Sequence, residues 1–180
     1  MDQAGAASSM DRAPDGYRIR FAEERDVPVI LQLIRDLAEY ERLAHEAVST
    51  EDDLRRTLFG PRPYAEVLLA ESTRETNAPP PVLGFALFFH NYSTFLGKPG
   101  LYLEDLFVRP ECRGRGVGAG LLRHLARLAR GRGCGRFEWS VLDWNQPAID
   151  FYRRLGAEPM DGWTVFRVTG EALERLAGEL

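Results

Sequence analysis

The spacing of hydrophobic positions changes from one segment of the chain to the next, and this spacing predicts an order of strands and helices. Some segments alternate apolar and polar side chains, as half-buried strands do, and others are the apolar runs typical of buried strands. The six predicted strands are 17–21, 65–70, 82–89, 102–108, 137–142 and 163–168. The polar loop 72–81 ends in three consecutive prolines, and it favours a hairpin between the second strand and the third.

Between the strands, apolar positions recur at intervals of three and four residues, as on one face of an α-helix. Residues suited to capping precede three of these segments, namely Asp26, Ser49 or Thr50, and Asp143 or Asn145. The predicted helices are 27–41, 51–59, 117–130, 146–155 and 170–180. The order β-α-α-β-β-β-α-β-α-β with a closing helix predicts an α/β fold, a mixed sheet with helices on both faces.

Length and composition fit a single domain at residues 17–180. The chain has 180 residues, of which 44% are hydrophobic, and this is enough for a sizeable core. Residues 1–16 are rich in Ala, Ser, Asp and Gly without the apolar core of a signal peptide, so we expect a disordered leader. No apolar run approaches the roughly twenty residues of a membrane span. We therefore expect a cytoplasmic protein without a membrane partner.

Charge and the metal-binding residue types narrow the function further. A net charge of -4 argues against a general nucleic-acid binder and suits positively charged substrates. His45, His90 and His124 are isolated and lack metal-ligand spacing, so no metal is expected. Cys112 and Cys134 are expected to be reduced thiols, because a chain of this size folds without disulfides.

The stretch 102–125 (YLEDLFVRPECRGRGVGAGLLRHL) reads as a strand, a glycine-arginine loop and a helix. Its glycines, Gly114, Gly116 and Gly118, allow tight or left-handed backbone angles, so that successive N–H groups can point into one concavity. The positive end of the helix dipole lies there, and Arg113 and Arg115 add two full charges. The stretch is suited to holding a pyrophosphate, and the alternative is a flexible, solvated loop.

Two common pyrophosphate-binding motifs do not match this loop. A nucleoside-triphosphate loop ends in Lys followed by Ser or Thr, whereas Gly118 is followed by Ala119 and Gly120. A dinucleotide-binding loop needs the order GxGxxG and an acidic residue about twenty positions later. The order here is RGRGVG at 113–118, which is the pattern Arg-x-x-Gly-x-Gly at a strand-to-helix junction.

Four segments resemble the GNAT acetyltransferases, and within them the diamine (spermidine/spermine) and thialysine branch. They are YLEDLFV at 102–108, RGRGVG at 113–118, VLDWNQPAIDFYRRLGA at 141–157 and GWTVF at 162–166. The resemblance implies the GNAT fold, with a central, mostly antiparallel sheet flanked by helices on both faces. It also implies acetyl-CoA as the acetyl donor, a small-molecule amine as the acceptor, and a homodimer.

The resemblance assigns the acids of the central strand. An amine attacks only when neutral, and a lysine-like amine has a pKa of about 10.4, so a base must take its proton. Glu104 corresponds to the general base, acting directly or through water, and Asp105 to a residue that holds the cationic substrate. Neighbouring strand positions point to opposite faces, so only one of the two is expected on the side of the active cleft. Either acid could instead make a structural hydrogen bond or ion pair.

The same resemblance assigns the acetyl-CoA site. Tyr152 corresponds to the acid that protonates the departing thiolate, since a phenol of pKa about 10 suits a thiol of pKa about 8.5. Backbone N–H groups near Phe107 and Val108 would meet the oxyanion and the pantetheine arm. The predicted cofactor-binding residues are Leu106, Phe107, Val108, Arg113, Gly114, Arg115, Gly116, Val117, Gly118, Asn145 and Tyr152. Tyr152 could instead be a packing aromatic, and Asn145 a plain helix cap.

The acceptor follows from further comparison with the two branches. Glu41 matches an acidic position that binds the distal amine in the polyamine enzymes, but Tyr92-Ser93-Thr94-Phe95 stands where those enzymes have Asp-Pro-Trp. This substitution favours thialysine, lysine-like amino acids or short diamines over spermine. Two alternatives remain open, namely acetylation of a protein lysine or N-terminus, and an acyl-CoA-binding sensor with an idle active site.

Overall fold

The computed structural model describes residues 16–74 and 81–178. They belong to two compact units, Met1–Ser140 and Val141–Leu180, which are described separately below. The leader predicted at 1–16 lies outside the described residues except for Gly16. The proline-rich end of the loop 72–81 also falls largely outside them.

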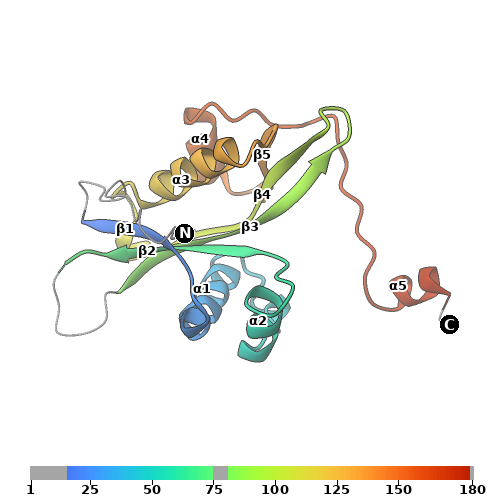
Figure 1. Ribbon diagram of the computed structural model, residues 1–180, viewed down its shortest axis with the longest axis horizontal. Helices are drawn as coiled ribbons and strands as arrows, with labels where there is room; N and C mark the ends of the chain where they lie inside the picture. Colours follow the sequence, from blue (N-terminus) through green and yellow to red (C-terminus); the bar gives the residue numbers. More distant parts are fainter. Residues whose placement is uncertain (1–15, 75–80, 179–180) are drawn as a thin grey trace, which may run out of the picture. The chain divides into compact units, whose positions relative to one another are not determined.

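The first unit is built on a five-stranded sheet in the order β1-β2-β3-β4-β5 (Figure 1). The three pairs from β1 to β4 are antiparallel, and β4 and β5 are parallel, which confirms the predicted mixed sheet and the hairpin of β2 and β3. The strands are β1 (Tyr17–Phe21), β2 (Glu66–Ser72), β3 (Val82–Ser93), β4 (Lys98–Val108) and β5 (Arg136–Trp139).

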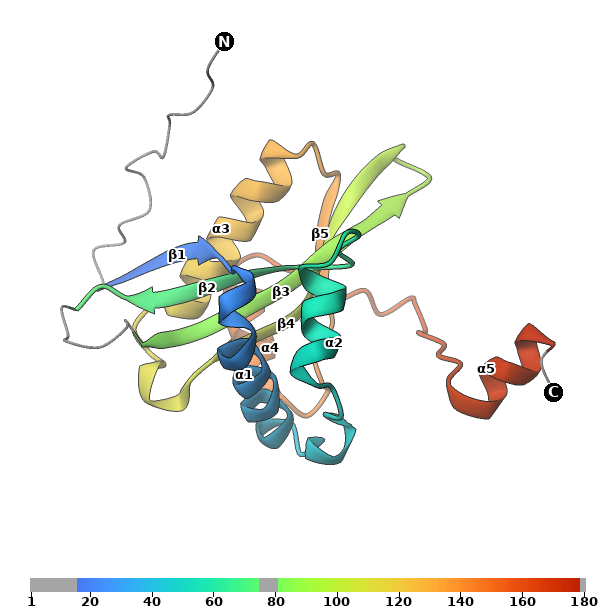
Figure 2. The same cartoon turned by 60° about the horizontal axis from the view of Figure 1, so that its bottom comes forward.

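Helices cover both faces of this sheet. Helices α1 (Val27–Tyr40) and α2 (Glu51–Leu58) lie on one face, and α3 (Val117–Gly131) lies on the other (Figures 1 and 2). Three single turns of 3-10 helix connect the elements: η1 (Glu24–Asp26), η2 (Ala44–Glu46) and η3 (Pro110–Cys112). The apolar stripes of α1 and α2 bury their side chains against Phe85 and Phe107 of the sheet.

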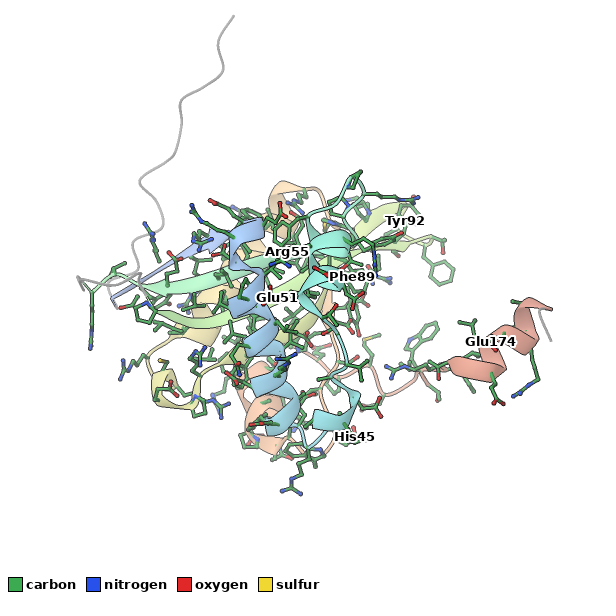
Figure 3. The ribbon with its side chains drawn as sticks, turned by 90° about the horizontal axis from the view of Figure 1, so that it is seen from below. His45, Glu51, Arg55, Phe89, Tyr92 and Glu174 are labelled. Carbon is green, nitrogen blue, oxygen red and sulfur yellow. The ribbon has the colours of Figure 1, made fainter. Side chains whose placement is uncertain are left out.

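Local capping explains where α2 begins. Thr50 is its N-cap: the hydroxyl accepts a hydrogen bond from the N–H of Asp53 at 3.2 Å, and the Asp53 carboxylate accepts one from the N–H of Thr50 at 3.1 Å. This reciprocal pair satisfies two N–H groups that the helix leaves unpaired. The side chains of Glu51 and Arg55 point toward one another one turn apart, at 2.6 Å (Figure 3).

Asp26 precedes α1 as predicted, but its carboxylate does not cap that helix. It accepts two hydrogen bonds from the guanidinium of Arg20, at 2.6 and 2.8 Å, and a third from the N–H of Glu23. The Nε of Arg20 donates to Glu71 on β2 at 2.7 Å, and Arg18 donates to the other oxygen of that carboxylate at 3.0 Å. One half-buried arginine therefore joins β1, β2 and the start of α1.

The second unit contains α4 (Gln146–Arg154) and α5 (Gly170–Ala177). The strand predicted at 163–168 is wrong, because this segment has no regular secondary structure. Its alternation is suited to a half-buried strand, but a strand needs a neighbour that satisfies its N–H and C=O groups, and this unit contains no other strand among its described residues. Val165 and Phe166 are accordingly 83% and 90% exposed.

The other helices and strands begin and end within a few residues of the predicted positions. The largest changes are at β4, which begins four residues earlier, and at β3, which continues four residues further, because these strands form a long hairpin arm. None of the described helices is long and apolar enough to cross a membrane.

We expect replacement of Arg20 by glutamine to lower the free energy of unfolding by about 2 kcal/mol at pH 7, because the buried Asp26 loses its bidentate cation and the buried Glu71 keeps only Arg18. The hydrogen bonds from Arg20 hold the pKa of Asp26 below its usual range. Burial raises the pKa of Glu71, but the hydrogen bonds from Arg20 and Arg18 outweigh it and lower that pKa as well. Lowered carboxyl pKa values stabilise the fold above the unfolded pKa, and this contribution is lost as the pH falls through the folded values.

Urea unfolding at several pH values measures this effect. The difference between wild type and Arg20→Gln should shrink below about pH 4, where the carboxylates become protonated. Arg25→Gln is the matched control, because Arg25 is exposed and its ion pair is with the exposed Glu23. Its effect should stay within about 0.5 kcal/mol. An Arg20→Gln difference that is the same at pH 3 and pH 7 would contradict this assignment.

Candidate active site

An irregularity in β4 decides where the two predicted acids lie. Leu87 of β3 pairs with Asp105, but the next residue, Phe88, pairs with Leu103, so Glu104 is an extra residue in β4. Paired residues share a face of the sheet, and Leu87 packs against the core beneath α1 and α2. Asp105 therefore lies on the face of α1 and α2.

Glu104 lies on that face as well. Leu103 shares the opposite face with Phe88, and ordinary alternation then returns Glu104 to the face of α1 and α2. The bulge breaks the alternation between Glu104 and Asp105. The expectation that the two acids point to opposite faces is therefore wrong, because alternation holds only where a strand pairs without an inserted residue.

Three carboxylates interact on this face of the sheet. Burial, together with the negative charges of Glu104 and Glu41, raises the pKa of Asp105 to about 7. Glu41 is the C-cap of α1 and directly follows its last residue, and burial raises the pKa of Glu41 too. Glu104 is the most exposed of the three. The structure thus brings together the predicted substrate residues, on two elements, in a site that favours a cation.

Tyr102 of β4 precedes Glu104 by two residues, and it contacts an aromatic ring and a hydroxyl group on neighbouring segments. Tyr102 pairs with Phe89, and their rings are 5.2 Å apart between centroids. Figure 3 looks onto this face of the sheet and labels Phe89. The hydroxyl groups of Tyr102 and Ser140 lie 2.7 Å apart. Sequence reasoning did not single out Tyr102 or Ser140, since nothing local signals a contact between residues 38 positions apart.

The backbone of β4 has an open edge next to the acids. Strand β5 pairs with β4 only from Gly100 to Leu103. On the other side, Leu106, Phe107 and Val108 pair with β3. Within the described first unit, the edge of β4 beyond Leu103 therefore has no strand partner. An extended ligand can bind to the N–H groups of such an edge as a strand would.

The glycine-arginine loop joins this open edge to α3. Gly114 and Gly116 have positive φ angles of 74° and 77°, and Gly116 is the N-cap of α3. A Cβ atom at Gly114 would meet nothing within 4 Å, so the backbone angle and not lack of space requires glycine there. Val117 and Gly118 already belong to α3, and Gly118 is not among the glycines with positive φ. The loop fits a pyrophosphate at the positive end of a 15-residue helix.

A tyrosine from the first strand holds this loop from behind. The hydroxyl of Tyr17, which is 1% exposed, donates a hydrogen bond to the carbonyl oxygen of Gly116 at 3.1 Å. Gly120 leaves room for that hydroxyl, because a Cβ atom there would lie 2.3 Å from it. The pattern of the first strand predicts that Tyr17 is buried, but no local signal connects it to a residue 99 positions away.

The two arginines of the loop have different surroundings. Arg113 donates from Nε to the carbonyl oxygen of Val108 at 2.9 Å, and its guanidinium lies 4.6 Å from the ring centroid of Tyr40. Arg115 is exposed and makes no hydrogen bond or ion pair with the described part of the chain. Of the two, Arg115 is the one free to meet a phosphate.

The remaining predicted residues belong to the second unit. Asn145 is the N-cap of α4, and its side-chain oxygen accepts a hydrogen bond from the N–H of Ala148 at 3.4 Å. Tyr152 lies on α4 with its ring 5.4 Å from that of Phe151. The capping alternative for Asn145 is thus observed, whereas contacts of Asn145 and Tyr152 with acetyl-CoA stay predictions.

The cysteines are free, and the described side chains form no metal-binding group. Cys112 and Cys134 are free cysteines, as predicted, and Cys112 is buried beside the loop. Among residues 16–74 and 81–178, no three His, Cys, Asp or Glu side chains are grouped so that they could hold a metal ion.

Comparison with known proteins settles the family. The family model described as "Acetyltransferase (GNAT) family" matches residues 30–157, which include the acids, the loop and α4. The chain belongs to the GNAT acetyltransferase family. GNAT acetyltransferases use acetyl-CoA, and the open edge of β4 and the glycine-arginine loop are suited to that ligand. The chain is therefore an acyltransferase, and its predicted fold is confirmed.

Several relatives and a solved structure are similar to this chain over nearly their whole length. The thialysine N-epsilon-acetyltransferase of Bos taurus is 42% identical over 166 residues, covering 89% of this chain and 97% of the relative. The L-ornithine N5-acetyltransferase of Arabidopsis thaliana is 36% identical and covers 92% of each chain. Among solved structures, an integron cassette protein from V. cholerae matches with a TM-score of 0.74 and 26% identity, covering 90% of this chain and 98% of that one.

We expect Tyr17→Phe to weaken binding of coenzyme A by about threefold to tenfold, because the carbonyl of Gly116 loses the hydrogen bond that fixes the loop. The substitution removes one oxygen and keeps the buried ring. Titration calorimetry with coenzyme A measures the change. Tyr64→Phe, at an exposed tyrosine, is the matched control and should leave the affinity unchanged. Equal affinities for wild type and Tyr17→Phe would show that Tyr17 has no part in holding the loop.

Proposed function

We propose that this GNAT enzyme transfers the acetyl group of acetyl-CoA to the terminal primary amine of a small aliphatic amine. Thialysine, lysine-like amino acids and short diamines are the proposed acceptors. The observation that carries the proposal is the cluster of Glu41, Glu104 and Asp105 on one face of the sheet, beside the open edge of β4. A compact set of negative charges favours a small cation.

The names of the relatives support this class of acceptor. Those named thialysine N-epsilon-acetyltransferase and L-ornithine N5-acetyltransferase act, by their names, on amino acids with a second amine at the end of the side chain. A human relative named spermidine/spermine N(1)-acetyltransferase-like protein 1 is 36% identical over 92% of this chain and 24% of its own length, whereas the Bos taurus thialysine enzyme is 42% identical. We therefore propose that thialysine-like substrates react better than spermine.

The proposed reaction is direct attack of the neutral amine, with Glu104 as the general base. Acetyl-CoA supplies the activated thioester. Glu104 is exposed on the bulge and can accept the amine proton directly or through one water, while Glu41 and Asp105 hold positive charge nearby. No acyl-enzyme is needed, and Cys112 is buried.

Asp105 adds a pH dependence to this scheme. A carboxyl with a pKa of about 7 is partly protonated at neutral pH, and its ionised form is needed to attract the amine. We propose that activity rises with pH as Asp105 ionises.

The backbone and a tyrosine complete the proposed reaction. In this proposal, N–H groups along the open edge of β4, near Phe107 and Val108, donate hydrogen bonds to the oxyanion and to the pantetheine arm. We keep Tyr152 as the acid that protonates the leaving thiolate. Arg115 and the N-terminus of α3 would hold the pyrophosphate.

We also propose that the enzyme is a cytoplasmic homodimer. Residues 160–176 expose a series of apolar side chains, of which Trp163, Val165 and Phe166 are more than 70% exposed. Segment 163–168 keeps the alternation of a strand without a partner in its own unit, and the outer edge of β5 has no neighbouring strand in the described sheet. A second copy could cover both. Sedimentation that gives the mass of one chain at micromolar concentration would contradict the dimer.

The function is tested by following thiol release from acetyl-CoA with thialysine, lysine, ornithine, putrescine, spermidine, spermine and a lysine-containing peptide. We expect thialysine-like amines to have the highest kcat/KM. Glu104→Gln and Tyr152→Phe should each lower kcat by about 10²-fold or more, because each removes a proton-transfer group. Spermine turning over as well as thialysine would overturn the preference, and turnover of the peptide alone would overturn the small-amine function.

The pH profile of kcat/KM in the same assay tests Asp105. The kcat/KM of wild type should fall as the pH decreases through about 7, which gives the profile an acid limb. Asp105→Asn should lack this acid limb, and it should bind the amine more weakly than wild type does. Lys98, an exposed strand residue, supplies a matched control as Lys98→Gln, which should keep the wild-type limb. An unchanged limb in Asp105→Asn would assign it to another group.

A further inference from the structure

Arg113 begins the glycine-arginine loop, and its side chain contacts α1 and β4. Its Nε donates to the carbonyl oxygen of Val108 at 2.9 Å. Its guanidinium lies 4.6 Å from the ring centroid of Tyr40 and 5.6 Å from that of Phe107, within the range of cation–π contacts. The arginine thus contacts the last residue of α1 and the last two residues of β4.

Both contacted elements lead directly into proposed binding sites. Tyr40 is the final residue of α1, and the next residue is Glu41, one of the three acids. Phe107 and Val108 end the open edge of β4, and the loop that follows Arg113 forms the N-terminus of α3. The guanidinium of Arg113 therefore connects the glycine-arginine loop to the end of α1, where Glu41 lies.

We propose that Arg113 is a positioning residue that couples the binding of acetyl-CoA to the binding of the amine, through its contact with Tyr40. This inference rests on the proposed function. When the loop closes on a pyrophosphate, Arg113 holds the end of α1, and hence Glu41, in the position that receives the amine. By linkage, the amine must tighten coenzyme A binding by the same factor. The pyrophosphate contact itself falls to Arg115 and the helix N-terminus.

Titration calorimetry tests the coupling with coenzyme A as the ligand, in the absence and in the presence of saturating thialysine. For wild type we expect thialysine to tighten coenzyme A binding by about fivefold or more. Arg113→Gln and Tyr40→Leu should reduce this factor to about one. Tyr40→Phe keeps the ring beneath the guanidinium and should keep the factor, which separates the cation–π contact from other roles of this tyrosine.

Arg115→Gln is the matched control from the same loop. It should weaken coenzyme A binding and leave the thialysine factor as in wild type. If Arg113→Gln behaves like Arg115→Gln, Arg113 is a phosphate ligand and the proposal is overturned. A factor of one in wild type also overturns it. If wild type binds coenzyme A but neither binds nor acetylates thialysine or the other amines, the proposed function fails, which is a different result.

Discussion

The site depends on β4 keeping a strand partner on one side and losing it on the other. Beyond Leu103 the strand stays paired with β3, so its backbone is held firmly, while its other edge leaves β5. Unpaired N–H groups inside a protein are costly unless something satisfies them. An extended ligand can do so, and the arm of acetyl-CoA is the ligand that the family uses. The sheet thus leaves one edge of β4 available to an extended ligand.

The bulge at Glu104 complements this open edge. It adds one residue to β4 at the point where β5 stops pairing, and it turns two consecutive carboxylates to the face of α1 and α2. Negative charges brought together in this way repel one another, and burial raises the pKa of Asp105 to about 7. That arrangement opposes folding at high pH but suits a group that must attract an amine near neutrality.

The glycine-arginine loop is held by contacts with two other elements. Tyr17 of β1 binds the carbonyl of Gly116 from within the core, and Arg113 reaches the end of α1. Left-handed glycines give the loop its shape, but glycine also makes a chain flexible, so contacts of this kind are needed to keep the N–H groups in place before a ligand arrives. The ion pairs of Arg20 join β1, β2 and the start of α1 and so hold the same strand that carries Tyr17.

The sequence by itself determined the order of the elements as far as α4, the mixed sheet, the loop of Arg113–Gly118 and the family. Each of these is recorded locally, in the spacing of apolar residues or in a short motif. Tertiary structure alone decided the face on which Glu104 and Asp105 lie, the contact of Tyr17 with Gly116, the direction of Arg113 and the lack of a strand at 163–168. These features depend on the register between two strands, on contacts between distant residues, or on an available strand edge. A local pattern indicates which residues prefer to be buried, but it does not indicate which distant residues they will contact.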